Sequence, residues 1–453
     1  MATEKIAQFI SETNYGKIPP EAIDVAKKAI LDYFSVAVAG SNESGVRIMS
    51  ELIKQIGAAR EAAVICGGFK TSADSAAWIN GTMSHALDYD DTIANSARYN
   101  MHPSVPILPA VWALGEKCKG SGKEILAAYI VGMEVAYVIG SAMAMKATEV
   151  GWHTTSMLGT ISAAAASAHM LKLIPSQTRM ALGIAGSLAG GLGRNVGTMT
   201  KPMHAGNAAR NGAVAALLAK NGFTGNANIM EGEAGFCSMF TGGVGREPTD
   251  KVSDLGSNWN IVSTGIAFKP YPSCRATHSC IDATLHLRKE LGITEEQVAE
   301  IVCKVNPGFD RYWILHKPKT GYEAKFSFEY CVATALIRGK VSLDDFSDAK
   351  FVDTKVQNFL PQVSVVYPQD WGIGMDLAQE IVIKLKNGTM HSHRVAFPKG
   401  EPENPMTDEE LTAKLKDCVR QVPRAQAIER VVDNILNIEK LEDVRDLMDT
   451  LML

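Results

Sequence analysis

The sequence of 453 residues lacks the features that mark several common classes of protein. Its formal net charge is −4, from 45 Lys and Arg against 49 Asp and Glu, so it has no basic surplus of the kind that nucleic-acid binding requires. Its eight cysteines form no Cys-x-x-Cys pair, which indicates free thiols in a reducing compartment. With 46% hydrophobic and 21% charged residues, the chain has a globular composition and not a disordered one.

The chain also lacks an evident targeting or membrane segment. Its N-terminus carries Glu4 and Lys5 and has no long apolar run of the signal-peptide type. Residues 154–174 form the longest weakly polar stretch, but alanine is their commonest residue and Ser, Thr, His and Lys occur among them, so we expect no membrane span. We therefore expect a cytoplasmic protein whose partner is neither a membrane nor a nucleic acid.

Acidic residues are absent from one long segment. No Asp or Glu occurs in residues 150–230, and the basic residues of this segment are Lys172, Arg179, Arg194, Lys201, Arg210 and Lys220. A nearly neutral chain has thus concentrated positive charge, which predicts a small polyanionic ligand such as a di- or tricarboxylate. A phosphate ligand is the weaker alternative, because residues 191–197 have the wrong spacing for GxGxxG and no GxxxxGK[ST] motif occurs.

Hydrophobic periodicity predicts a mainly α protein. The expected helices of the first half cover about 20–39, 45–57, 73–91, 104–118, 123–147, 154–172, 176–191 and 204–221. The pattern then changes: residues 298–306 suit a strand, and alternation around Asn387-Gly388 predicts a hairpin over 380–395, with helices at about 276–291 and 325–338. Residues 407–451 return to helices that we expect to pack on the first half. The predicted domains are a large all-helical domain (1–264 with 397–453) and a smaller α+β domain (265–396).

The segment His85-Ala-Leu-Asp88-Tyr-Asp90-Asp91-Thr92 gathers polar groups at the end of a predicted helix. Helical spacing would place His85, Asp88 and Asp91 on one face, as a base or as a site for a substrate hydroxyl. A polar helix end with ordinary caps is one alternative. A metal site is another on ligand type, but no second dense cluster of ligands supports it, and we predict no metal. The DxDD match to terpene cyclases is rejected, because only 7% of the residues are aromatic.

Two histidines directly precede predicted helices. His102 stands before Pro103, which disfavours a helical conformation at His102 and places it on a loop. His153 follows Gly151-Trp152 in the same way. A loop histidine is a better candidate for proton transfer than one on an apolar helix face, although either residue alone can equally be a solvated or capping histidine.

Basic residues occupy two further helix starts. Lys201 lies at the start of a predicted helix, where a cation opposes the helix dipole; a bound anion would remove that conflict, and a surface lysine is the alternative. Lys269 and Arg275 precede or open another helix, on which Arg275 and His278 share a face. Cys274 lies between them, but no local pattern supports a nucleophile there.

These motifs, in this order, resemble the MmgE/PrpD family, which includes 2-methylcitrate dehydratase, cis-aconitate decarboxylase and iminodisuccinate epimerase. The segments that carry the resemblance span nearly the whole chain: 85–92, 102–104, 151–153, 200–210, 233–236 and 269–278. The resemblance implies a helical domain, an α+β lid domain, an active site in the cleft between them and a homodimer. It also implies a small polycarboxylate substrate and no metal or organic cofactor.

The resemblance also implies the site residues. The catalytic region would contain Asp88, Thr92, His102, His153, Lys201, Lys269 and His278, with a weaker match at Tyr322, Lys325 and Ser327. Lys269, Arg275 and His278 would reach the substrate only after the lid closes. Residues 93–101 are longer than in the family's dehydratases and decarboxylases, which can bring Arg98 or Tyr99 into the pocket. Val105 stands where methylcitrate dehydratases tend to carry Asp, and both departures argue against 2-methylcitrate.

The expected chemistry is stabilisation of negative charge on a carbon beside a carboxylate. Lys201, Lys269 and Arg275 would bind carboxylates and stabilise that charge, and the histidines would exchange protons. The same groups serve dehydration, decarboxylation or epimerisation. We predict a cofactor-independent lyase acting on a di- or tricarboxylic acid, with an epimerase of a dicarboxylate such as iminodisuccinate as the alternative. A non-catalytic helical scaffold is the least favoured hypothesis.

Overall fold

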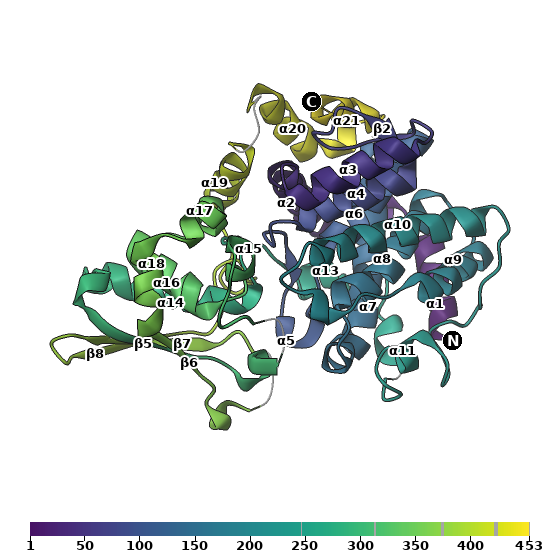
Figure 1. Cartoon of the computed structure of the whole chain (residues 1–453). Helices are drawn as coiled ribbons and strands as arrows, with labels where there is room; N and C mark the ends of the chain where they lie inside the picture. Colours follow the sequence, from purple (N-terminus) through teal and green to yellow (C-terminus); the bar gives the residue numbers. More distant parts are fainter. Residues whose placement is uncertain (246, 312–313, 373–375, 421–424, 453) are drawn as a thin grey trace.

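The structure, a computed structural model, describes residues 1–245, 247–311, 314–372, 376–420 and 425–452. The described residues are mainly helical and gather around two hydrophobic cores, one all-helical and one built on a sheet (Figure 1). This is the predicted class, a mainly α protein with a smaller α+β part.

The first core contains the helices that periodicity predicts in the first half of the chain. Its long helices are α1 (Ala2–Glu12), α2 (Pro20–Gly40), α3 (Ser44–Ile56), α4 (Ala73–His85), α6 (Ser104–Cys118), α7 (Gly122–Val150), α8 (Thr154–Met170), α9 (Pro175–Leu188) and α10 (Thr200–Lys220). Its short elements are α5 (Ser96–Tyr99), α11 (Phe236–Met239), α12 (Thr249–Val252), α13 (Asn260–Ser263), and the strands β1 (Ala62–Ala63), β2 (Lys70–Thr71), β3 (Thr92–Ile93) and β4 (Ile266–Ala267). The helix predicted over 73–91 is shorter than expected, because α4 ends at His85.

Small residues let α10 lie at the centre of this core against α4, α6, α8 and α9. At the crossing with α4, a Cβ on Gly206 would lie 2.1 Å from the Trp78 carbonyl oxygen, and one on Gly81 would lie 2.7 Å from the Gly206 Cα. A larger side chain at either glycine would therefore force the helices apart. This close packing brings the C-terminal end of α4 beside the first turn of α10.

Among the described residues, the helix that combines the length and the apolar composition of a membrane span is α7, and not residues 154–174. By length and composition alone α7 could cross a membrane, but 89% of its most apolar window is buried inside the protein. A helix that is hydrophobic all round and buried is a core helix of a large domain.

The second core is formed by a mixed sheet of order β6-β5-β7-β8 and the helices on it. Its elements are α14 (His278–Leu291), β5 (Val298–Lys304), α15 (Gly321–Ala324), α16 (Phe328–Arg338), α17 (Asp348–Phe351), α18 (Thr354–Phe359), β6 (Val363–Val366), β7 (Gln379–Leu385) and β8 (Met390–Val395). Strand β5 pairs parallel with β6 and antiparallel with β7, and β7 and β8 form the predicted hairpin around Gly388, whose φ is 90°.

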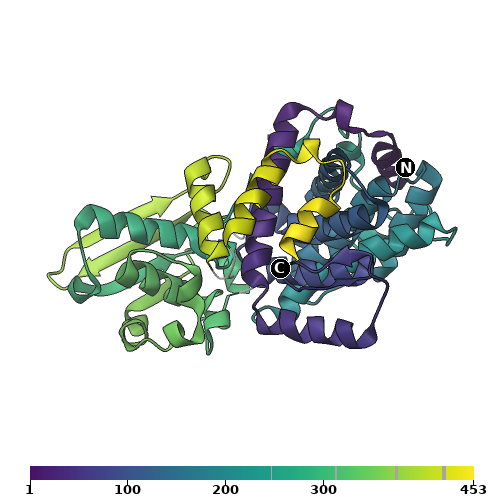
Figure 2. The ribbon, with the colours of Figure 1, turned by 90° about the horizontal axis from the view of Figure 1, so that it is seen from above.

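The C-terminal tail returns to the helical part, as expected. Its helices are α19 (Asp408–Val419), α20 (Ala425–Leu436) and α21 (Arg445–Leu451), and α19 and α20 pack on α2 (Figure 2). A buried ion pair of 2.6 Å joins Lys414 of α19 to Asp32 of α2. The segment around β4 also belongs to the first core, where Ile266 and Phe268 are buried and β4 pairs with β3.

Candidate active site

A cleft lies where the two cores meet. The space in this cleft is about 620 Å³, including its open mouth. The helical side contributes Asp88, Thr92, Asn100, Met101, His102, His153, Thr154, Thr155, Val196 and Lys201, and the α+β side contributes Cys274, Arg275, Ala276, Phe309, Phe326 and Leu377. Five residues expected in the site from the helical half, and Arg275 from the other, therefore line one cavity.

The loop that carries the aspartates, residues 86–91, is called the acidic loop below. Because α4 ends at His85, the prediction that His85, Asp88 and Asp91 share a helix face is wrong. Asp88 instead has a left-handed conformation, with φ of 52°, which aspartate tolerates better than most residues. This turn points the Asp88 carboxylate toward the start of α10.

Asp88 is buried and forms ion pairs with two ammonium groups. Its Oδ1 lies 3.0 Å from Lys201 Nζ and 2.9 Å from Lys269 Nζ. Burial raises the pKa of Asp88, but the two ammonium groups outweigh it and hold that pKa well below its ordinary value. Two cations thus share the Asp88 carboxylate at the floor of the cleft.

Lys269 already contacts Asp88 in this structure. Its Nζ also donates to the Asp88 carbonyl oxygen at 2.9 Å, and its side chain is fully buried. The expectation that Lys269 reaches the site only on closure is therefore wrong, since it follows β4, which belongs to the helical core.

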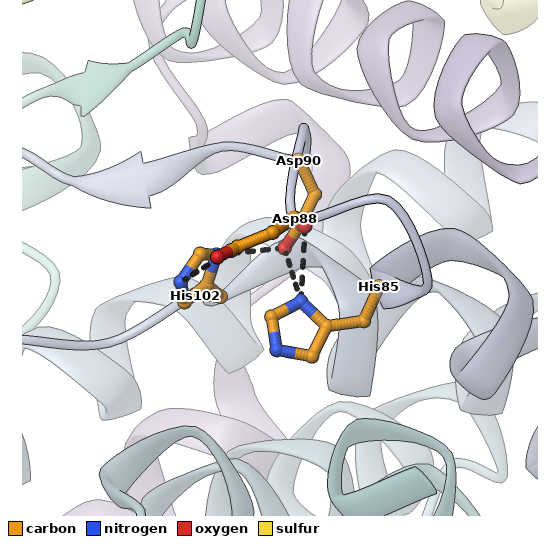
Figure 3. A group of neighbouring side chains, drawn as sticks. All are labelled: His85, Asp88, Asp90 and His102. Carbon is orange, nitrogen blue, oxygen red and sulfur yellow. Dashed lines mark hydrogen bonds and ion pairs between the residues drawn. The ribbon is translucent and has the colours of Figure 1, made fainter. Parts of the chain in front are cut away.

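Asp90 holds two histidines at once (Figure 3). Its carboxylate lies 2.9 Å from His85 Nδ1 and 2.8 Å from His102 Nδ1. A carboxylate can only accept, so both Nδ1 atoms carry hydrogen. The Nε2 of His102 lies 3.7 Å from Asp88 Oδ1, and burial lowers the pKa of His102 to about 4. His102 is therefore a neutral acceptor at the cleft wall.

A second histidine pair continues this arrangement. His153 Nδ1 lies 3.0 Å from His204 Nδ1, and the His153 ring stacks on His85 with centroids 5.9 Å apart. Burial, with the neighbouring His204 and Lys201, holds the pKa of His153 well below its ordinary value. Burial also lowers the pKa of His204 to about 4. Neutral imidazoles thus lie beside the lysine ammonium groups.

We expect these histidines to make the protein less stable in acid. Histidine takes up a proton near pH 6.5 when unfolded, whereas His102 and His204 resist it down to about pH 4 when folded. Their stabilisation is present above pH 6.5 and is lost as the pH falls toward 4, by at most about 1.4 kcal/mol per pH unit for each histidine. In urea unfolding at pH 7, 6 and 5, His204→Asn should flatten the pH dependence, and the exposed His286→Asn should leave it unchanged. An equal slope in wild type and His204→Asn would contradict the assignment.

The cluster of His85, Asp88, Asp90 and His102 also has the residue types of a metal site, with donor atoms within 4.8 Å of one another. However, Lys201 and Lys269 already approach Asp88 Oδ1 at hydrogen-bonding distance. A divalent cation would have to displace or lie beside two ammonium groups. The donor set therefore fits the observed hydrogen-bond network better than it fits a metal.

Arg275 lines the cleft, but its guanidinium is already bound. Nε and Nη2 donate to Glu401 Oε1 at 3.1 and 2.7 Å, and Nη1 donates to the Lys399 carbonyl oxygen and lies 3.0 Å from His278 Nδ1. In this arrangement Arg275 is neutralised by Glu401 and is not a free carboxylate binder. His278 is fully buried behind Arg275, with Nε2 3.2 Å from the Ser273 carbonyl oxygen, and does not line the cleft.

The long loop between Thr92 and His102 contributes other residues than those expected. Arg98 is exposed and lies over the Tyr99 ring, which packs edge-on against Tyr137 of α7. Neither Arg98 nor Tyr99 lines the cleft; Asn100 and Met101 do. The α5 turn directs the side chains at 98 and 99 away from the cavity before the chain returns to it.

Two expected residues keep buried hydroxyl groups with no hydrogen-bond partner among the described atoms. The Thr92 hydroxyl is one of them and borders the cleft, so it can bind a ligand oxygen. The Tyr322 hydroxyl is the other, but Tyr322 does not line the cavity. Near Tyr322, Lys325 Nζ donates to the Leu87 carbonyl oxygen at 2.8 Å.

Sequence reasoning missed Asn100, His204 and Glu401. His204 lies three residues after Lys201, so it was visible in the motif at 200–210. Glu401 gave no signal, because it follows the hairpin and is 126 positions from its partner Arg275.

Comparison with known proteins agrees with the motifs. Residues 4–249 match the MmgE/PrpD N-terminal domain and residues 271–438 match the MmgE/PrpD C-terminal domain. Cis-aconitate decarboxylase of Homo sapiens is 29% identical, over 97% of this chain and 92% of the human protein. That of Mus musculus is 30% identical over 98% and 91%, and that of Aspergillus terreus is 27% identical over 99% and 95%. With most of its length matched by the two domain models, this chain belongs to the MmgE/PrpD family.

Proposed function

We propose that the protein is a carboxy-lyase that removes CO₂ from a small tricarboxylate of the cis-aconitate type, using only its own side chains. The observation that carries this proposal is the pair of lysines on Asp88: Lys201 and Lys269 share one carboxylate beside neutral histidines. An ammonium group in a partly closed cleft stabilises negative charge that develops on a bound carbon acid. The names of the relatives, cis-aconitate decarboxylases, support the same reaction.

Lys201 is the group best placed to bind the substrate. It lines the cleft, and its ammonium, which has three N–H donors, forms an ion pair with Asp88 Oδ1. The Phe326 ring of the α+β side lies 4.9 Å from Lys201 Nζ and limits the directions in which the ammonium can point. Thr92 and Asn100 offer neutral polar groups on the same wall.

The chemistry balances with one proton. The bond from a substrate carbon to one carboxylate breaks, CO₂ leaves, and the electron pair remains on the carbon and is shared with a conjugated carboxylate. A proton then adds to carbon, so a trianion and one proton give a dianion and CO₂. His102 and His153 line the cleft, and one of them delivers that proton after taking it from solvent. His102 can hold it, because the resulting imidazolium would lie between Asp90 and Asp88.

Epimerisation of a dicarboxylate is the second candidate. It is favoured by the two histidines, because one of them, neutral, can remove a proton from one face of a carbon while the other, protonated from solvent, gives a proton to the opposite face. The loop between Thr92 and His102 also brings Asn100 and Met101 to the cavity. The homodimer and the cytoplasmic location stay predictions.

Proton NMR in D₂O, with cis-aconitate, 2-methylcitrate and iminodisuccinate in separate tubes, tests the proposal. We expect cis-aconitate to be consumed with formation of a C5 dicarboxylate that carries deuterium from solvent. Deuterium exchange at a retained α-carbon of iminodisuccinate without loss of CO₂ would establish the epimerase instead. No reaction with any of the three, and no thermal stabilisation by any of them, would contradict both candidates.

A further inference from the structure

Three lysines bind three consecutive carbonyl oxygens of the acidic loop. Lys325 Nζ donates to the Leu87 oxygen at 2.8 Å, Lys269 Nζ to the Asp88 oxygen at 2.9 Å, and Lys414 Nζ to the Tyr89 oxygen at 2.7 Å. All three side chains are buried, with exposed fractions of 0% for Lys269, 3% for Lys325 and 4% for Lys414. Burying an ammonium is costly unless it is well bound, so three at one loop indicate a function for its position.

The three lysines come from three parts of the chain. Lys269 follows β4 of the helical core, Lys325 lies between α15 and α16 of the α+β part, and Lys414 is on α19 of the tail. Lys414 is neutralised by Asp32 at 2.6 Å, and Lys269 by Asp88. Lys325 has no carboxylate within ion-pair distance among the described residues; its Nζ donates to the carbonyl oxygens of Leu87 and Pro272 and lies 5.1 Å from the centre of the Phe346 ring. The ammonium of Lys325 is therefore stabilised by backbone carbonyl oxygens and not by a carboxylate.

We propose that Lys325 is a positioning residue, whose ammonium fastens the α+β part to the acidic loop and so fixes Asp88 and the roof of the cleft relative to each other. Lys325 does not line the cleft and has no role in the proposed reaction. The inference rests on the proposed function only for its kinetic consequence.

The neighbours of Lys325 show how its attachment reaches the cleft. The next residue, Phe326, lines the cavity and lies against Lys201. The Lys325 carbonyl oxygen accepts from Cys274 N at 2.9 Å, and Cys274 and Arg275 also line the cavity. Loosening Lys325 would therefore shift residues on the roof of the cleft and the acidic loop on its floor together.

The charge environment makes this attachment sensitive to pH. Burial, together with Lys269 and Lys201, lowers the pKa of Lys325 to about 8, although Glu43 and Asp88 act to raise it. A charged donor binds a carbonyl more strongly than a neutral amine does, so the attachment is strong at pH 7 and weakens above pH 8. Arginine at this position would stay charged, since its pKa exceeds 12.

Hydrogen–deuterium exchange of the full chain, read on a peptide that covers residues 86–91, tests the inference without any substrate. We expect faster exchange of this peptide in Lys325→Met than in wild type, with peptides from β5 and β7 unchanged. The matched control is Lys340→Met, an exposed lysine of the same α+β part. After correction for intrinsic exchange rates, wild type should also lose protection above pH 8, whereas Lys325→Arg should keep it. The arginine variant carries the test if Lys325→Met does not fold.

Kinetics give the second readout, with whichever substrate the wild type turns over. A misplacement of about 1 Å can cost about 10²-fold in rate, so kcat of Lys325→Met should fall by about that factor while KM changes less than threefold. Equal exchange of the 86–91 peptide in Lys325→Met and wild type, or equal pH dependence in Lys325→Arg and wild type, would overturn the inference whatever the reaction proves to be. Loss of activity without a change in exchange would also overturn it.

Discussion

Lys201→Met is expected to lower kcat/KM by about 10³-fold, equivalent to about 4 kcal/mol of transition-state stabilisation. Lys201 is the ammonium that lines the cleft, and methionine keeps its length while removing its charge and its donors. Asp88 would still be paired with Lys269 at 2.9 Å, so the substitution leaves no buried carboxylate unpaired and the fold should survive. Steady-state kinetics with cis-aconitate measure the effect.

The controls separate charge at the site from charge elsewhere. Lys172→Met removes a lysine of the same acid-free segment, but that side chain is 76% exposed and pairs with Glu124; surface pairs contribute little, and its kcat/KM should stay within twofold of wild type. Lys201→Arg keeps the charge with a different shape and should fall between the two. A kcat/KM of Lys201→Met within threefold of wild type would show that the Lys201 ammonium does not act on the substrate.

Asp90→Asn is expected to lower kcat by about 10² to 10⁴-fold with little change in KM. The Asp90 carboxylate can only accept, and it fixes hydrogen on Nδ1 of His85 and His102. The asparagine amide can donate to Nδ1 instead, which would move the hydrogen to Nε2 and remove the acceptor from the cleft side. Substrate binding depends mainly on Lys201, so KM should change much less than kcat.

Asp91→Asn provides the matched control on the same loop. Burial, with Asp32 and Asp90 nearby, holds the pKa of Asp91 well above its ordinary value, which favours the protonated carboxyl, and Ser104 Oγ donates a hydrogen bond to it. An amide of the same shape should therefore leave kcat within about fivefold of wild type. The pH profile gives a further readout, because a changed tautomer at His102 alters the acid limb of kcat. Equal losses in Asp90→Asn and Asp91→Asn would indicate a general disturbance of the loop.

Local sequence patterns predicted the fold well where local physics decides it. Alternation around Asn387-Gly388 predicted the β7–β8 hairpin, since that turn favours a residue with positive φ. The end of α4 was placed too late, because apolar and polar residues continue at helical spacing through residue 91. Tertiary contacts end the helix instead: the carbonyl oxygens of Leu87, Asp88 and Tyr89 bind lysines from elsewhere in the chain.

The site was predicted residue by residue only where a motif holds its members together. Asp88, Thr92, His102, His153 and Lys201 line one cleft, as the resemblance implied. The partners of Arg275 and Lys325 are 126 and 238 positions away, and no periodicity links such distances. The expectation of an anion at Lys201 also shows this limit: the nearest anion in the structure is the chain's own Asp88 at 3.0 Å.

The most direct test of the account is the amount of CO₂ released from cis-aconitate by the wild type and by Lys201→Met, followed with the C5 product in the same sample. The account predicts one CO₂ for each molecule of product in the wild type, and a rate about 10³-fold lower in the variant. Consumption of cis-aconitate without CO₂, or equal CO₂ release by both proteins, would contradict it.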